Sequence, residues 1–257
     1  MLPLKDNIPT RMFPIVTVVI IVINVVVYFG FEKGGWSAPS NDNAVIEYSF
    51  IPYELSHTDQ NCAQIGQQIG CGNEEALAGR GADTEQPSVF ITIFTAMFMH
   101  GSLLHIAGNM LFLWIFGNNI EDSMGKVKYL IFYFFGGIAA TLAQFAFDTN
   151  AVVPNLGASG AIAAVLGGYA LLYPRARVVT LIFIIFFITL VELPALLVLG
   201  AWFVLQLFDA SSQQPGAGGG VAVWAHIGGF VFGLIAIKLF ASRYDASYDR
   251  HSRLPVY

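Results

Sequence analysis

Charged residues are scarce in this chain. Only 11% of its 257 residues are Asp, Glu, Lys or Arg, compared with about 25% in ordinary soluble proteins. The two cysteines are too few for a metal cage built from thiolates. The net charge of −5 argues against nucleic-acid binding, which favours basic surfaces. These shortages exclude an ordinary soluble protein and indicate an integral membrane protein.

Hydrophobic residues take the place of the missing charges and make up 56% of the chain. Six uncharged stretches fit the roughly 20 mostly apolar residues that a membrane-spanning helix needs. The first stretch has charged flanks and no clear cleavage site, so we interpret it as a retained anchor and not as a signal peptide. We therefore expect an all-α polytopic membrane protein with spans at 12–31, 102–119, 128–147, 158–173, 190–208 and 221–240.

The positive charges predict how these spans are oriented. If the N-terminus is cytoplasmic, ten of the twelve Lys and Arg residues lie on the cytoplasmic side, and only Lys33 and Arg80 lie outside. We expect cytoplasmic termini, a large external loop over residues 32–90 and a cytoplasmic tail over 241–257.

The external loop contains both cysteines of the chain, Cys62 and Cys71. Disulfides form in oxidising compartments, so an external position favours a bond between these two residues. Two free thiols are the alternative.

Residues 178–208 form an apolar run that is longer than one crossing needs, and Glu192 and Pro194 interrupt it. It fits either one crossing preceded by an embedded stretch or a hairpin of two crossings. A hairpin would move His226 to the opposite membrane face from Ser159. We predict a single crossing.

Two polar side chains, Ser159 and His226, are placed at similar depth in apolar spans. Ser159 begins the fourth span near the outer face, and His226 lies about one turn into the sixth, which descends from that face. A histidine inside hydrocarbon usually faces a partner or a water-filled cavity, although it can also simply bond a backbone carbonyl. Because a positioned imidazole activates a serine hydroxyl, we predict a catalytic Ser–His dyad. The helix N-terminus at Ser159 also favours negative charge on a substrate oxygen.

Small residues would allow these two spans to meet. Gly157 and Gly160 flank Ser159, and Gly229 and Gly233 have GxxxG spacing in the sixth span. Such faces permit close crossing of helices, which is ordinary membrane packing when taken alone. A Ser–His hydrogen bond requires that approach, so we assign supporting roles to Gly157, Gly160 and Gly229.

A third polar group is HGSLLHIAGN, His100–Asn109. His105 and Asn109 are four residues apart, so on a helix they share a face and can direct two donors at one point. This arrangement is typical of an oxyanion hole. His100 is interpreted as a supporting residue that ties the loop to the helix. Because the chain has no HExxH motif and the three histidines His100, His105 and His226 are spread over two spans, we expect no metal and no cofactor.

Together these motifs resemble those of the rhomboid intramembrane serine proteases. GASG at Gly157–Gly160, AHIGG at Ala225–Gly229 and HxSxxHxxxN at His100–Asn109 occur in the family's order. The resemblance implies a six-helix rhomboid-like bundle, with 1–257 as a single membrane domain and about 12–240 as its transmembrane core.

The resemblance also implies a role for each polar residue. Ser159 would be the nucleophile, and His226 would act first as general base and then as general acid. His105, Asn109 and the backbone N–H of Ser159 would form the oxyanion hole.

The implied substrates are membrane proteins, cut in or near a transmembrane segment within the lipid bilayer. The implied location is a bacterial inner or plasma membrane, with the site open to the external side. Trp202 and Phe203 would belong to a gate, and residues 211–220 would cap the site. The family often has an aromatic ring at the position of Ala163, so another group must orient His226 here. The alternative function is a catalytically silent rhomboid-like protein that binds transmembrane segments of partners.

Overall fold

The computed structural model describes residues 2–35, 42–66, 68–82, 86–184, 187–213 and 222–242. In chain order, its helices and strands are β1 (Leu2–Asp6), α1 (Ile15–Val26), the π-helical segment η1 (Val27–Phe31), α2 (Asp42–Tyr48), α3 (Pro52–Ser56), β2 (Asn61–Ile65), β3 (Gln68–Gly72), α4 (Glu74–Ala78), α5 (Val89–Thr95), the 3-10 turn η2 (Ala96–Phe98), α6 (Leu103–Phe112), the π-helical segment η3 (Leu113–Gly117), α7 (Asn118–Met124), α8 (Lys126–Phe147), α9 (Ser159–Leu172), β4 (Arg177–Ile184), β5 (Phe187–Pro194), α10 (Ala195–Ser212) and α11 (Val223–Phe240).

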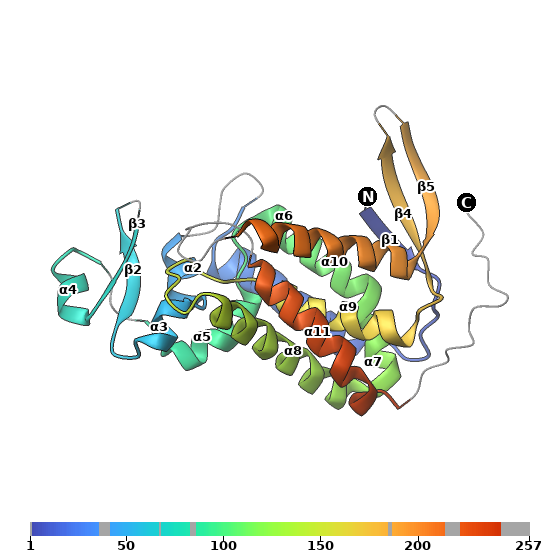
Figure 1. Cartoon of the computed structure of the whole chain (residues 1–257), viewed down its shortest axis with the longest axis horizontal. Helices are drawn as coiled ribbons and strands as arrows, with labels where there is room; N and C mark the ends of the chain where they lie inside the picture. Colours follow the sequence, from blue (N-terminus) through green and yellow to red (C-terminus); the bar gives the residue numbers. More distant parts are fainter. Residues whose placement is uncertain are drawn as a thin grey trace.

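Helices form most of the described structure, as the sequence predicts (Figure 1). Four of them are long and apolar enough to cross a membrane: the continuous helix Leu103–Met124, α8, α10 and α11. Shorter apolar helices cover Ile15–Phe31, Val89–Phe98 and Ser159–Leu172. The helical membrane core is therefore confirmed, and the count of six spans stays a prediction.

The centre of the bundle is α9, which packs against α8 and α11 and has almost all of its residues buried. Three glycines bring α9 and α11 into backbone contact. A Cβ added at Gly229 would overlap the carbonyl of Gly160, and one at Gly167 would overlap the carbonyl of Phe230. A Cβ at Gly233 would meet the backbone of Ala164. These positions accept glycine alone at this separation, which is the close crossing expected of small-residue faces.

Two small sheets add to the helices and were not predicted. In the first, β1, β4 and β5 pair in the antiparallel order β1-β4-β5. The predicted fifth span at 190–208 was wrong at its start, because residues up to Pro194 belong to β5 and the crossing helix α10 begins at Ala195. The run RVVTLIFI is rich in the β-branched residues that favour strands. Pro194 has no N–H for the ladder and fits directly before a first helical turn.

The second sheet lies within residues 32–90, the predicted external loop, at the opposite end of the molecule from the first (Figure 1). Its strands β2 and β3 are joined by a disulfide between Cys62 and Cys71, so the predicted bond is present. The buried carboxylate of Glu54 accepts the backbone N–H of Cys62 at 2.8 Å. Burial raises the pKa of Glu54 to about 7, against the lowering effect of that hydrogen bond.

A buried carboxylate joins the start of α1 to α7. The Glu121 side chain is 2% exposed, and it accepts the backbone N–H of Val16 at 3.0 Å and that of Thr17 at 2.8 Å. The Thr17 hydroxyl donates to the same carboxylate at 2.8 Å. The first turn of a helix has unpaired N–H groups and a positive dipole end, so a carboxylate is a favourable partner there.

We predict that Glu121→Ala lowers the free energy of unfolding by about 2–4 kcal/mol, because it leaves buried donors without an acceptor. The neighbouring variant Asp122→Ala is the matched control. Asp122 accepts the Met12 N–H at an exposed position, so its loss costs less than about 1 kcal/mol. Unfolding in detergent micelles, followed by circular dichroism, measures both, and equal losses would contradict the buried role of Glu121.

Candidate active site

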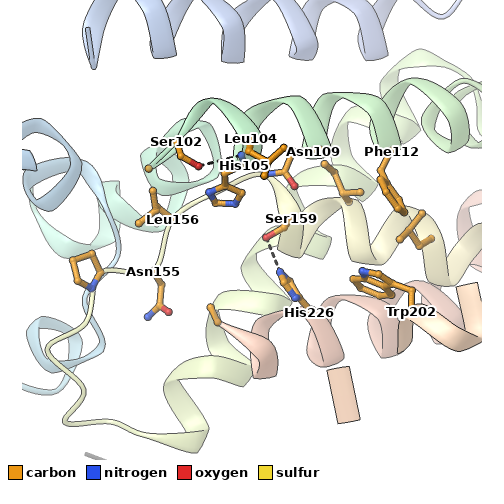
Figure 2. A pocket seen from close by; sticks show the side chains of 16 residues that line it. Ser102, Leu104, His105, Asn109, Phe112, Asn155, Leu156, Ser159, Trp202 and His226 are labelled. Carbon is orange, nitrogen blue, oxygen red and sulfur yellow. Dashed lines mark hydrogen bonds between the residues drawn. The ribbon is translucent and has the colours of Figure 1, made fainter. Parts of the chain in front are cut away.

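A cavity of about 570 Å³ lies between α6, α9, α10 and α11 (Figure 2). Its lining is largely apolar, with side chains such as Leu104, Phe112 and Trp202. Within this lining, polar side chains are contributed by Ser102, His105, Asn109, Asn155, Ser159 and His226.

Ser159 and His226 face each other across the cavity. The Ser159 hydroxyl oxygen lies 2.8 Å from Nε2 of His226, although the two residues are 67 positions apart in the sequence. Ser159 is the first residue of α9, and His226 lies in the first turn of α11 with 8% of its surface exposed. The contact between α9 and α11 therefore places a hydroxyl within hydrogen-bond reach of an imidazole, which is the geometry that nucleophile activation requires.

His100 orients the amide of Asn109 toward the cavity. Nδ1 of His100 lies 3.2 Å from the carbonyl oxygen of Phe98, which can only accept, so Nδ1 carries the proton. Nε2 then accepts from the Asn109 amide nitrogen at 2.9 Å. Burial lowers the pKa of His100 to about 3, and nearby His105 adds to this effect, so the ring is neutral. The Asn109 amide has a second N–H that this contact leaves unused.

The loop before α6 is held at both of its ends. Ser102 caps α6 by accepting the backbone N–H of His105 at 3.2 Å. Glu32 is fully buried just after η1 and accepts the backbone N–H of His100 at 3.0 and 3.1 Å. Burial raises the pKa of Glu32 to about 7, although this N–H bond acts in the opposite direction. Glu32 could not be singled out from the sequence, because a charge at the end of an apolar run has the pattern of an ordinary span boundary.

Gly157 lies in the loop that leads to Ser159, next to the His105 ring. Its φ of +116° is a conformation that other residues rarely adopt. A Cβ at this position would lie 2.8 Å from both Cε1 and Nε2 of His105. The backbone N–H of Gly157 donates to the carbonyl of Ala96 at 2.8 Å, which fixes the loop. Glycine is therefore required for His105 to keep its place in the cavity.

Helix α10 contributes two side chains next to His226. The ring of Trp202 lies 5.7 Å from the His226 ring and lines the cavity. Gln206 was not singled out in the sequence, and its Oε1 lies 2.6 Å from Nδ1 of His226. A lone amide within an apolar span is a signal that could have indicated it. Phe203 instead stacks on Phe230 at 4.5 Å.

Part of the predicted cap falls elsewhere. The expected cap at 211–220 begins inside α10, which ends at Ser212. Residues 214–220 lie outside the described part of the chain.

Residues 87–243 match the family model of the Rhomboid domain, and this region is more than half of the chain. The chain belongs to the rhomboid family. This rhomboid is 31% identical over 154 residues to Rhomboid protein 1, mitochondrial, of Saccharomyces cerevisiae, a match that covers 56% of the chain and 40% of the relative. It is 33% identical over 143 residues to the Presenilin-associated rhomboid-like protein A, mitochondrial, of Danio rerio, with coverage of 53% and 34%.

A bacterial relative is the Rhomboid protease GluP of Bacillus subtilis, which is 35% identical over 107 residues, or 40% of this chain and 20% of the relative. The matched regions thus span 40% or less of these three relatives. The family and the apolar helices identify an integral membrane protein. Because two of these relatives are named mitochondrial, the comparisons do not favour the predicted bacterial inner or plasma membrane, which stays a prediction.

We predict opposite effects on stability for two glycine variants near this cavity. Gly157→Ala forces a strained backbone and a clash with His105, so it lowers the free energy of unfolding by about 1–3 kcal/mol. Gly108→Ala, in α6 of the same cavity, meets no atom within 4 Å and raises helix propensity, so it stabilises by about 0.5–1 kcal/mol. Thermal unfolding in detergent measures both variants, and an equally stable Gly157→Ala protein would contradict the strain argument.

Proposed function

We propose that this rhomboid is an intramembrane serine endopeptidase. It would hydrolyse a peptide bond in or near the transmembrane segment of membrane-protein substrates. The observation that supports this best is the 2.8 Å contact between the Ser159 hydroxyl and His226 Nε2, at a cavity among helices of membrane-spanning length. The protease name of a bacterial relative is in keeping with the proposal.

In the proposed reaction, Nε2 of His226 accepts the Ser159 proton while the hydroxyl oxygen attacks the substrate carbonyl. The C–N bond then breaks as His226 gives this proton to the leaving amine, and an acyl group remains on Ser159. A water molecule, deprotonated by His226, attacks the acyl carbonyl. His226 then returns this proton to the departing Ser159 oxygen as the carboxyl product is released. No metal and no cofactor enter these steps.

The oxyanion that forms in both halves of the reaction would be stabilised by donors on α6 and α9. The amide of Asn109 has one N–H bound to His100 and one left for the substrate oxygen. The ring of His105 lines the same cavity. The backbone N–H of Ser159 lies at the start of α9, where the helix dipole favours negative charge.

We also propose that the chain forms one membrane domain of six spans, with Ile15–Phe31 and Ser159–Leu172 as the shorter crossings. Both termini would be cytoplasmic and the cavity would open externally. The disulfide-bearing region supports this orientation, since disulfides form in oxidising compartments. Phe50 of that region exchanges two backbone hydrogen bonds, of 3.0 and 2.8 Å, with Asn155 in the loop before Ser159.

Trp202 and Phe203 are proposed as the gate through which a substrate helix would enter. Trp202 lines the cavity next to His226, and Phe203 lies behind it against Phe230. Their helix, α10, has only 17% of its most apolar window buried, compared with 33–44% in the other three long helices. Of these four long helices, α10 would therefore lose the fewest buried contacts if it moved.

A fluorophosphonate probe tests the nucleophile directly. We expect the wild-type protein to be labelled on Ser159, and Ser159→Ala and His226→Ala to lose the label, because the first lacks the attacking oxygen and the second its base. Peptide mapping by mass spectrometry provides an internal control, since Ser102 lines the same cavity. An unlabelled wild-type protein that still binds transmembrane peptides would indicate the catalytically silent alternative.

We expect Asn109→Ala to lower kcat for cleavage of a transmembrane substrate in liposomes by about 10²–10³-fold, the usual effect of losing one oxyanion donor. The KM should change little, because this donor acts on charge that develops in the transition state. A variant with unchanged kcat would remove Asn109 from the oxyanion hole.

A further inference from the structure

The imidazole of His226 has a second hydrogen-bond partner besides Ser159. Nδ1 lies 2.6 Å from Oε1 of Gln206, a residue of α10 that is 20 positions away in the sequence. Both side chains are more than nine-tenths buried, with Gln206 at 9% and His226 at 8% exposure. A hydrogen bond between two buried groups on different helices fixes the orientation of both.

The identity of the two atoms decides which tautomer the ring adopts. To take the Ser159 proton, Nε2 must be unprotonated, and in a neutral imidazole the proton then lies on Nδ1. The amide oxygen of Gln206 accepts a hydrogen bond from the protonated Nδ1. In the other tautomer Nδ1 carries a lone pair instead of a proton, and this hydrogen bond is lost. Gln206 therefore favours the form in which Nε2 can act as a base.

Two other side chains, Ala163 and Trp202, do not select the tautomer of His226. Ala163 offers only a methyl group, and α9 and α11 approach so closely there that a Cβ at Gly229 would lie 3.2 Å from the Ala163 Cβ. The Trp202 ring is tilted by 42° relative to the imidazole, with centroids 5.7 Å apart, so it packs beside the ring and does not select a tautomer.

We propose that Gln206 is the positioning residue of the catalytic base, so that Ser159, His226 and Gln206 form a hydrogen-bonded row with a neutral amide as its third member. This inference rests on the proposed protease function. Unlike a carboxylate, the amide adds no negative charge next to the imidazolium that forms during reaction. Its contribution is to hold the ring and its tautomer.

Two variants separate this role from simple packing. Gln206→Leu keeps the approximate size of the side chain and removes the acceptor, and Gln206→Glu keeps an acceptor oxygen at the same reach. Leu205→Ala is the matched control, because Leu205 is the preceding residue of α10 and is 60% exposed. Thermal unfolding of each variant in detergent establishes that it is folded.

We expect Gln206→Leu to lower kcat for a transmembrane substrate by about 10²-fold with an unchanged KM, as for other losses of orientation in an active site. Gln206→Glu should recover most of the wild-type kcat, and Leu205→Ala should retain it. A Gln206→Leu protein that is folded and keeps the wild-type kcat would overturn the inference.

A second measurement does not depend on activity. In protein labelled with ¹⁵N-histidine, we expect the His226 signals, assigned by their absence in His226→Ala, to show a protonated Nδ1 in the wild type and to change tautomer in Gln206→Leu. Unchanged signals in that variant would overturn the inference on their own. If wild-type protein cuts no substrate and takes no fluorophosphonate, the proposed function fails, and the ¹⁵N signals still decide whether Gln206 sets the tautomer.

Discussion

The direct contact of two helix backbones, α9 on α11, is the constraint on which the site depends. At Gly167, Gly229 and Gly233 the helices lie closer than any side chain would allow. Without a hydrophobic driving force inside lipid, such packing is a main source of helix association. The same contact places the first residue of α9 against the first turn of α11, so packing and the Ser–His geometry have one cause.

Buried polar groups complete this arrangement at the helix ends. Glu121 satisfies the first turn of α1, Glu32 holds the loop before α6, and His100 holds Asn109. Each is a charged or polar side chain whose burial would be costly if it had no partner. Each of them bonds a group that fixes either a helix start or a cavity residue. In these three cases a buried polar side chain stabilises the packing of apolar helices through a hydrogen bond.

Much of this could be read from the sequence, because polar residues stand out in apolar spans. Ser159, His226, His105 and Asn109 were selected on that ground, and the structure brings all four to one cavity. The strands β4 and β5 were missed, because a continuous apolar run satisfies the pattern of a buried strand and that of a membrane helix equally well. Contacts such as the one made by Gln206 depend on which helices become neighbours, and periodicity alone does not determine that.

The sparse packing of α10 has a consequence for the timing of the reaction. If this helix swings outward to admit a substrate, it carries the amide away from the imidazole, and the ring is free to rotate and exchange its proton between nitrogens. Peptide-bond cleavage would then wait until the helix returns. A transmembrane segment that leaves the site before α10 closes again would not be cut. The time that a segment stays at the site, and not only its sequence, would then decide which substrates are cut.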